Sequence, residues 1–167
     1  SVSLSSTSYT YNGSVKTPSV TVKNSKGKAL TKGKDYTVTY SSGRKNVGKY
    51  SVKITFKGNY SGTVTKTFTI KPKATSVNKL TALKGGIKVY VNKQATQTTG
   101  YQIQYSTSSS FANAKTATIG KNTMLSKSIT GLAKGKKYYV RVRTYKTVSG
   151  TKYYSSWSKA KSITTKK

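Results

Sequence analysis

The chain has 167 residues, among them 32 lysines and arginines but a single acidic residue, Asp35, so its formal charge is +31. It also lacks cysteine and histidine, which excludes disulfides, thiolate metal sites and catalysis by either residue type. Acid–base catalysis by paired carboxylates and metal binding by several carboxylates are excluded as well. We therefore expect no enzymatic activity, no metal and no cofactor.

Hydrophobic residues make up 33% of the chain, and low hydrophobicity combined with high net charge is typical of disordered proteins. Against disorder stand 14 tyrosines and a recurrent alternation of apolar and polar side chains, which favours strands. No apolar run approaches the ~20 residues that a membrane-spanning helix requires. We predict a folded, all-β chain without a transmembrane segment.

In the first half of the chain, alternation with a period of two predicts strands at residues 20–23, 36–40, 50–56 and 63–70. Asn12-Gly13 lies between alternating residues and favours a type I′ turn, because both central positions of that turn need a positive φ. In the last strand Lys66 falls on the same side as Val64 and Phe68. A lysine on an apolar side indicates a rim or edge position.

The first half also carries a series of short motifs: Tyr9, Tyr11-Asn12-Gly13, Pro18, Gly33-Lys34-Asp35-Tyr36-Thr37-Val38-Thr39-Tyr40, Asn46-Val47-Gly48, Gly58-Asn59-Tyr60-Ser61-Gly62-Thr63 and Phe68-Thr69-Ile70. Through them, residues 1–71 resemble a family of bacterial Ig-like repeats, found in tandem on secreted and surface proteins of Gram-positive bacteria. The resemblance implies a small β-sandwich and brings no catalytic residues with it.

Lys71-Pro72-Lys73 predicts a domain boundary. The proline ends the preceding strand, and the lysines favour an exposed joint. We expect a first domain over residues 1–71, a short linker over residues 72–75 and a second domain over residues 76–167.

The second half shows the same alternation, which predicts strands at residues 87–91, 100–105, 116–119, 125–130, 135–145 and 162–164. Ser149-Gly150 predicts a turn that returns the chain through Lys152-Tyr153-Tyr154. Six or seven short strands with regular turn signals indicate a β-sandwich.

The strand at residues 135–145 has the clearest alternation. One face, which we expect to line the core, carries Tyr138, Val140 and Val142. The other face, which we expect to meet solvent, carries Tyr139, Arg141, Arg143 and Tyr145. Leu132 precedes Tyr138 at the spacing of a tyrosine corner, in which a tyrosine hydroxyl bonds back to the backbone a few residues upstream.

Three segments make residues 74–167 resemble a fibronectin type III domain: Gly100-Tyr101-Gln102-Ile103-Gln104-Tyr105, Leu132-Ala133-Lys134-Gly135-Lys136-Lys137-Tyr138 and Ser156-Trp157-Ser158. This chain has Tyr90-Val91 where that family usually places a core tryptophan, so we expect a somewhat smaller core. Together the two halves predict one fold class, all-β, with two tandem antiparallel β-sandwich (Ig-like) domains.

Asp35 admits two interpretations. Intramolecular isopeptide bonds in Gram-positive surface domains join lysine to asparagine beside an acid, and Asp35 could assist such a bond at Asn24, Asn46 or Asn59. Alternatively, Asp35 caps its own turn through its side chain, as aspartate often does. We favour the turn, because it explains the residue completely.

The near-absence of acids suggests a polyanionic environment, since such a surface attracts anionic polymers. The residues we expect to bind them are Arg141, Arg143, Lys136, Lys137 and Lys152. Tyr139, Tyr145 and Trp157 are candidates for stacking, and Tyr153 and Tyr154 could lie on the same exposed face near the two arginines. The plainer interpretation is a solvated surface that keeps a secreted protein soluble and separates edge strands.

We therefore predict a non-catalytic, extracellular module, secreted or attached to the cell surface or wall, that binds teichoic acid or acidic polysaccharide mainly by charge. Nucleic acid should bind only non-specifically, at low salt. One alternative is a structural subunit of an extracellular fibre or surface array that self-assembles through edge strands. Another is a carbohydrate-binding or spacer module of a secreted glycosidase, an analogy at the level of the fold.

Overall fold

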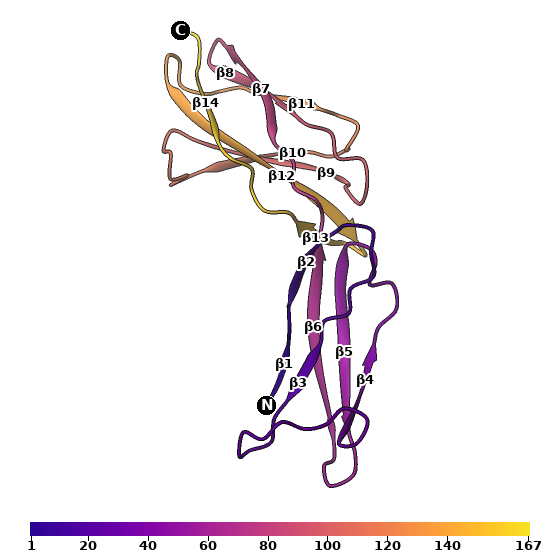
Figure 1. Ribbon diagram of the computed structural model, residues 1–167. Coiled ribbons are helices and arrows are strands. Elements are labelled where there is room, and N and C mark those ends of the chain that lie inside the picture. The colour runs from indigo at the N-terminus through magenta and orange to yellow at the C-terminus, as the bar shows by residue number, and fades with distance from the viewer. The chain divides into compact units, whose positions relative to one another are not determined.

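The computed structural model describes residues 1–167, which form strands and connecting loops without a helix. The chain divides into two compact units, residues 1–71 and 72–167 (Figure 1). Each unit contains two β-sheets with buried side chains between them. The predicted fold class, two tandem β-sandwiches, is confirmed. No helix capable of spanning a membrane is present.

The first unit pairs a small sheet with a larger one. The small sheet contains β1 (Val2–Leu4) and β3 (Val20–Val22), and the larger contains, in order, β2 (Ser8–Thr10), β6 (Thr63–Lys71), β5 (Gly48–Phe56) and β4 (Tyr36–Tyr40). The strand pairs are antiparallel except for β2 and β6, which are parallel. Alternation along β5 and β6 places one face of both strands in the core. Its side chains Val52, Ile54, Phe68 and Ile70 are at most 1% exposed.

Lys66 lies at an edge, as its apolar neighbours indicated. β2 pairs only with the last part of β6, at residues 69–71, so β6 has no strand on that side around Lys66. The lysine is solvent-exposed.

Asn12-Gly13 forms a turn, but the predicted type I′ geometry is wrong. Only Gly13 has a positive φ, of 80°. The Asn12 side chain accepts a hydrogen bond from the Ser14 N–H at 3.0 Å, which makes an Asx turn. The strands before and after it, β2 and β3, pair with β6 and β1 rather than with each other. Tertiary pairing therefore overrides the hairpin signal.

The second unit contains a three-stranded and a five-stranded sheet. The three-stranded sheet runs β11 (Ser126–Ile129), β8 (Gly86–Val91), β7 (Val77–Leu83). The other runs β10 (Lys115–Ile119), β9 (Gly100–Ser106), β12 (Lys137–Val148), β13 (Thr151–Tyr154), and β14 (Lys161–Thr164) also pairs with β12. Their facing side chains form one core, in which Ile87, Val89, Ile103, Val140 and Val142 are fully buried.

β12 is anchored at both ends as the sequence predicts. At its start, the Tyr138 hydroxyl accepts a hydrogen bond from the Ala133 N–H at 3.2 Å, which confirms the tyrosine corner. At its end, Ser149 and Gly150 have φ values of 46° and 79° and connect paired residues of β12 and β13. Two consecutive positive φ angles in a two-residue loop are the signature of a type I′ turn.

Residues 72–75, expected as a linker, are bonded to the second unit. The Thr144 hydroxyl donates to the Lys73 carbonyl oxygen at 2.6 Å. The Thr75 hydroxyl donates to the Asn92 carbonyl oxygen, also at 2.6 Å. These bonds make the segment the first part of the second unit, in agreement with the division after Lys71.

Candidate polyanion-binding face

The outer face of the five-stranded sheet brings Arg141 and Arg143 together on β12. Val140 and Val142, which alternate with them, are fully buried, and the two arginines are half-buried on the opposite face. Arg141 is paired with Gln104 of β9, and Arg143 is paired with Gln102. Directly paired residues share a face, so each arginine lies beside a glutamine.

The glutamines orient the guanidinium groups. Arg141 Nε donates to Gln104 Oε1 at 2.7 Å, and Arg143 Nε donates to Gln102 Oε1 at 2.8 Å. These bonds use one N–H of each guanidinium. The Nη1 and Nη2 groups remain as donors, in the fork geometry that matches a phosphate or carboxylate.

Aromatic rings alternate with the two guanidiniums. Arg141 Cζ lies 4.1 Å from the centre of the Phe111 ring and 5.0 Å from that of Trp157. Arg143 Cζ lies 4.2 Å from Trp157 and 3.9 Å from Tyr154. We call these five residues the arginine ladder. Each such contact attracts the cation to the negative face of a ring.

Burial of Arg143 in this ladder lowers the pKa of its guanidinium below the ordinary arginine value, because removal of water disfavours the charged form. The phenol of Tyr154 acts in the opposite direction and raises that pKa. The arginine still carries its charge at neutral pH, so the ladder holds two cations side by side without a carboxylate between them.

Two of the three lysines predicted beside the arginines lie near aromatic rings. Lys137 Nζ is 5.4 Å from the centre of the Tyr139 ring, and Lys152 Nζ is 5.0 Å from the centre of the Tyr145 ring. Lys136 is solvent-exposed, and its backbone N–H donates to the Thr165 hydroxyl at 3.1 Å.

Two of the three stacking candidates are not open platforms. The prediction that Tyr145 faces solvent is wrong, because the side chain is only 4% exposed. The alternation of buried and exposed side chains along β12 ends there, since the neighbouring Thr144 is also buried. Burial raises the pKa of the Tyr145 phenol above 10.0. Trp157 is half-buried and in contact with both arginines of the ladder. Tyr139, also half-buried, carries the Lys137 contact described above.

Sequence reasoning missed Phe111, Gln102 and Gln104 as members of this face. The two glutamines occupy alternate positions of a predicted strand, so pairing β9 with β12 would have found them. Phe111 comes from the loop after β9 and has φ 60°. Nothing periodic in that loop indicates where its ring lies.

Asp35 caps a turn, as we favoured. The Thr31 N–H donates to Asp35 Oδ2 at 2.7 Å, and the Asp35 N–H donates to the Thr31 carbonyl oxygen at 2.8 Å. Asn24, one of the asparagines considered for a crosslink, accepts hydrogen bonds from the backbone N–H groups of Lys26 and Lys28 at 3.0 Å. Both side chains therefore stabilise local turns.

No protein-family model matches this chain, and no curated protein matches it. Among solved structures, the crystal structure of the FN1–FN3 domains of chicken CNTN1 is similar, with a TM-score of 0.50 and 20% sequence identity. The match covers 73% of this chain and 44% of that one, so this chain spans less than half of that structure's length. At this identity the likeness shows the fold alone, an Ig/fibronectin type III-like arrangement of β-sandwiches.

The ladder predicts that Arg143 contributes to stability although it is a cation in a strongly cationic protein. Arg143→Gln should lower the free energy of unfolding by about 1–3 kcal/mol, because it removes two ring contacts and a charge-assisted hydrogen bond. The measurement is denaturant unfolding followed by circular dichroism. Lys127→Gln, at an exposed position of β11, removes the same charge and should change stability by less than about 0.5 kcal/mol. Equal effects of the two substitutions would contradict the role assigned to the ladder.

Proposed function

We propose that this chain is a non-catalytic extracellular module of a bacterial cell surface or wall that binds anionic polymers, teichoic acid or acidic polysaccharide, mainly by charge. The observation that carries the proposal is the formal charge of +31 with one carboxylate in 167 residues. A soluble domain needs a net charge of only about 2–8 to stay in solution. Solubility alone therefore does not account for the loss of nearly every acid.

The distribution of the lysines supports binding along an extended polymer. Solvent-exposed lysines occur in both units, for example Lys26 and Lys53 in the first and Lys121 and Lys161 in the second. Dispersed cations attract a polyanion by releasing its counterions, an effect that needs no shaped site and weakens with salt. Affinity of this kind suits a polymer of repeating charge better than a small molecule.

The arginine ladder gives this diffuse attraction one oriented element. Arg141 and Arg143 hold their guanidiniums in fixed planes through Gln104, Gln102 and the aromatic rings. A pre-oriented guanidinium loses less side-chain entropy on binding than a free lysine does, and it can bind a phosphate or carboxylate through two N–H groups. The ladder should therefore contribute more per charge than the dispersed lysines.

Extracellular placement rests on resemblance and on the fold. The first unit carries the motifs of Gram-positive surface repeats, and the second carries those of fibronectin type III domains. Modules with these folds occur in tandem outside cells, an argument by analogy at the level of the fold. A non-catalytic role agrees with a composition that supplies neither a carboxylate pair nor a histidine.

The first test is co-sedimentation with Gram-positive cell walls, with and without their teichoic acid, across a salt series. Binding should require teichoic acid and weaken steeply with salt. Arg141→Gln with Arg143→Gln should weaken it more than the matched pair Lys26→Gln with Lys28→Gln, once circular dichroism shows that both variants are folded. Binding indifferent to salt and to teichoic acid would contradict the proposal, and equal losses in the two double variants would remove the special role of the ladder.

A second candidate function, assembly through an edge strand, is favoured by β4. This strand lies at the end of its sheet, and its residues Tyr36–Tyr40 include no charge and no proline. The Ser41 N–H donates to the Ser51 carbonyl oxygen, and the Lys57 N–H donates to the Asp35 carbonyl oxygen. Because successive residues of an antiparallel strand point their N–H and C=O groups alternately toward and away from the partner, those of Val38 point away from β5. Unprotected edges of this kind pair with strands of other molecules.

Assembly and polymer binding respond to salt in opposite directions. Repulsion between copies of charge +31 opposes self-association at low salt, and added salt screens it. If β4 mediates assembly, high-mass species should increase with salt in analytical ultracentrifugation, and Thr39→Lys should abolish them. Thr130→Lys, an equal charge change in an exposed turn, should leave them intact. A protein that stays monomeric at every salt concentration would rule assembly out.

A further inference from the structure

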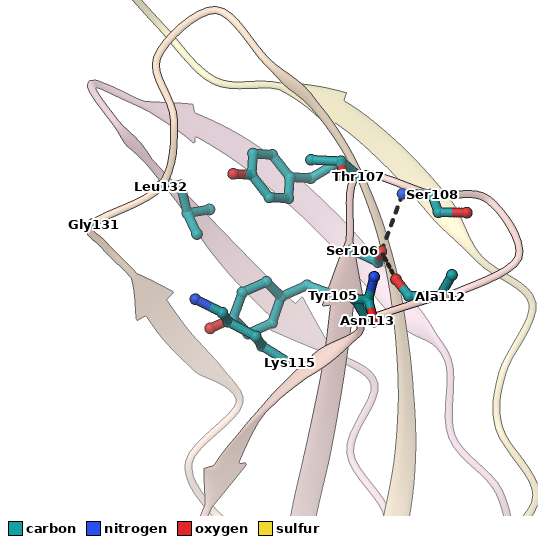
Figure 2. Close-up of a pocket in the computed structure, with 10 residues that line it drawn as sticks. Tyr105, Ser106, Thr107, Ser108, Ala112, Asn113, Lys115, Gly131 and Leu132 are labelled. Atoms are coloured by element: carbon teal, nitrogen blue, oxygen red, sulfur yellow. Dashed lines mark hydrogen bonds between the residues drawn. The ribbon is translucent and has the colours of Figure 1, made fainter.

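A cavity of about 300 Å³ opens on the second unit, between the end of β9, the following loop and the turn before β12 (Figure 2). The apolar and aromatic side chains of its lining are Tyr105, Ala112, Leu132 and Tyr138. The polar side chains of its lining include Ser108, Asn113 and Lys115. Figure 2 shows Leu132 on one side and the loop with Ser106, Ser108 and Ala112 on the other.

This composition suits a sugar ring. A pyranose has faces of C–H groups, which pack on aromatic and aliphatic surfaces, and an edge of hydroxyls, which needs hydrogen-bonding groups. Ligand pockets combine such apolar walls with a few polar groups and measure about 300–1,000 Å³. The present cavity lies at the lower end of that range, so its size suits one ring rather than a folded oligomer.

The loop that forms one wall is held in an unusual conformation. Phe111 and Asn113 have φ values of 60° and 50°, in the left-handed region, which asparagine adopts readily but phenylalanine rarely does. The Ser106 hydroxyl donates to the Ala112 carbonyl oxygen at 2.7 Å and accepts from the Ser108 N–H at 3.0 Å. Such strain persists only where surrounding contacts impose it.

The arginine ladder supplies one of those contacts. The Phe111 ring packs on the Arg141 guanidinium, with 4.1 Å between the ring centre and Cζ. The same loop thus joins the ladder through Phe111 and lines the cavity through Asn113. A loop fixed from both sides presents its polar groups in a set geometry, which reduces the cost of ordering them around a ligand.

The charge of the site selects an anionic sugar. Lys115 is the charged residue of the lining, and no carboxylate accompanies it. We propose that the cavity binds one uronic acid ring of an acidic polysaccharide, with the ring against Tyr105, the carboxylate at Lys115 and a hydroxyl at Asn113. The inference rests on the proposed function and adds to it a local site whose ring contacts, unlike diffuse charge attraction, persist in salt.

The test is a titration of the full chain with trigalacturonate, followed residue by residue by NMR at high salt. Tripolyphosphate serves as a probe with charge but no sugar ring. Trigalacturonate should produce saturable shifts around the cavity, and tripolyphosphate should not. Residue-resolved shifts also separate this cavity from one of about 280 Å³ on the first unit, which is lined in part by Lys23, Phe56 and Tyr60.

Two substitutions examine the site without threatening the fold. Asn113→Gly removes the amide, and glycine adopts the positive φ at least as readily. Lys115→Gln removes the charge from an exposed position. Each should weaken trigalacturonate binding about 3- to 10-fold, the equivalent of one lost hydrogen bond. Lys127→Gln, with an equal charge change on β11, should leave the affinity unchanged.

The outcomes separate this inference from the proposed function. Shifts around the cavity that both substitutions weaken would support the uronate site. Equal responses to trigalacturonate and tripolyphosphate, or affinities unaffected by Asn113→Gly and Lys115→Gln, would overturn the site and leave binding by charge intact. Failure of both probes to bind even at low salt would overturn the site and the proposed function together.

Discussion

The structure depends on one constraint, the placement of 32 cationic side chains in a protein with a single carboxylate side chain. Neutral groups take the place of acids as their partners. Lys16 Nζ donates to the Asn12 side chain at 2.6 Å, and Lys161 Nζ donates to the Asn78 carbonyl oxygen at 2.8 Å. Arg44 packs on the Tyr40 ring, 4.9 Å from its centre. Such contacts fix a cation but do not neutralise it, so its charge remains to attract an external anion.

β12 connects this constraint to the proposed binding. Its inner face completes the core, its outer face carries the two arginines of the ladder, and Tyr138 at its start lines the cavity. The glutamines of β9 and the ring of Phe111 hold the ladder from the neighbouring strand and loop. The same strand therefore contributes to the core, to the arginine ladder with Arg141 and Arg143, and to the cavity.

Sequence periodicity predicted most of the fold, because strand alternation and short turns depend on neighbouring residues. Most strands, the tyrosine corner of Tyr138 and the turn at Ser149-Gly150 follow from such local patterns, whereas β1, β2 and β7 were not predicted. The failures came where distant contacts decide. Asn12-Gly13 favours a hairpin locally, but its flanking strands pair elsewhere. Tyr145 falls on the solvent face by alternation, yet it is buried, and Phe111 reaches Arg141 from a loop without a pattern.

The central claim is that the unbalanced charge of the folded protein is a binding surface for anionic polymers. A ligand that binds the folded state more tightly than the unfolded state raises the unfolding midpoint by mass action. The unfolded chain carries the same charge, but the folded protein presents it at higher density and should bind a polyanion more tightly. The most direct measurement is thermal unfolding at low salt with long-chain polyphosphate, and with neutral dextran as control. We expect polyphosphate to raise the midpoint by about 5 °C or more, with the increase shrinking as sodium chloride is added. A midpoint that polyphosphate leaves unchanged, or that dextran raises equally, would contradict the account.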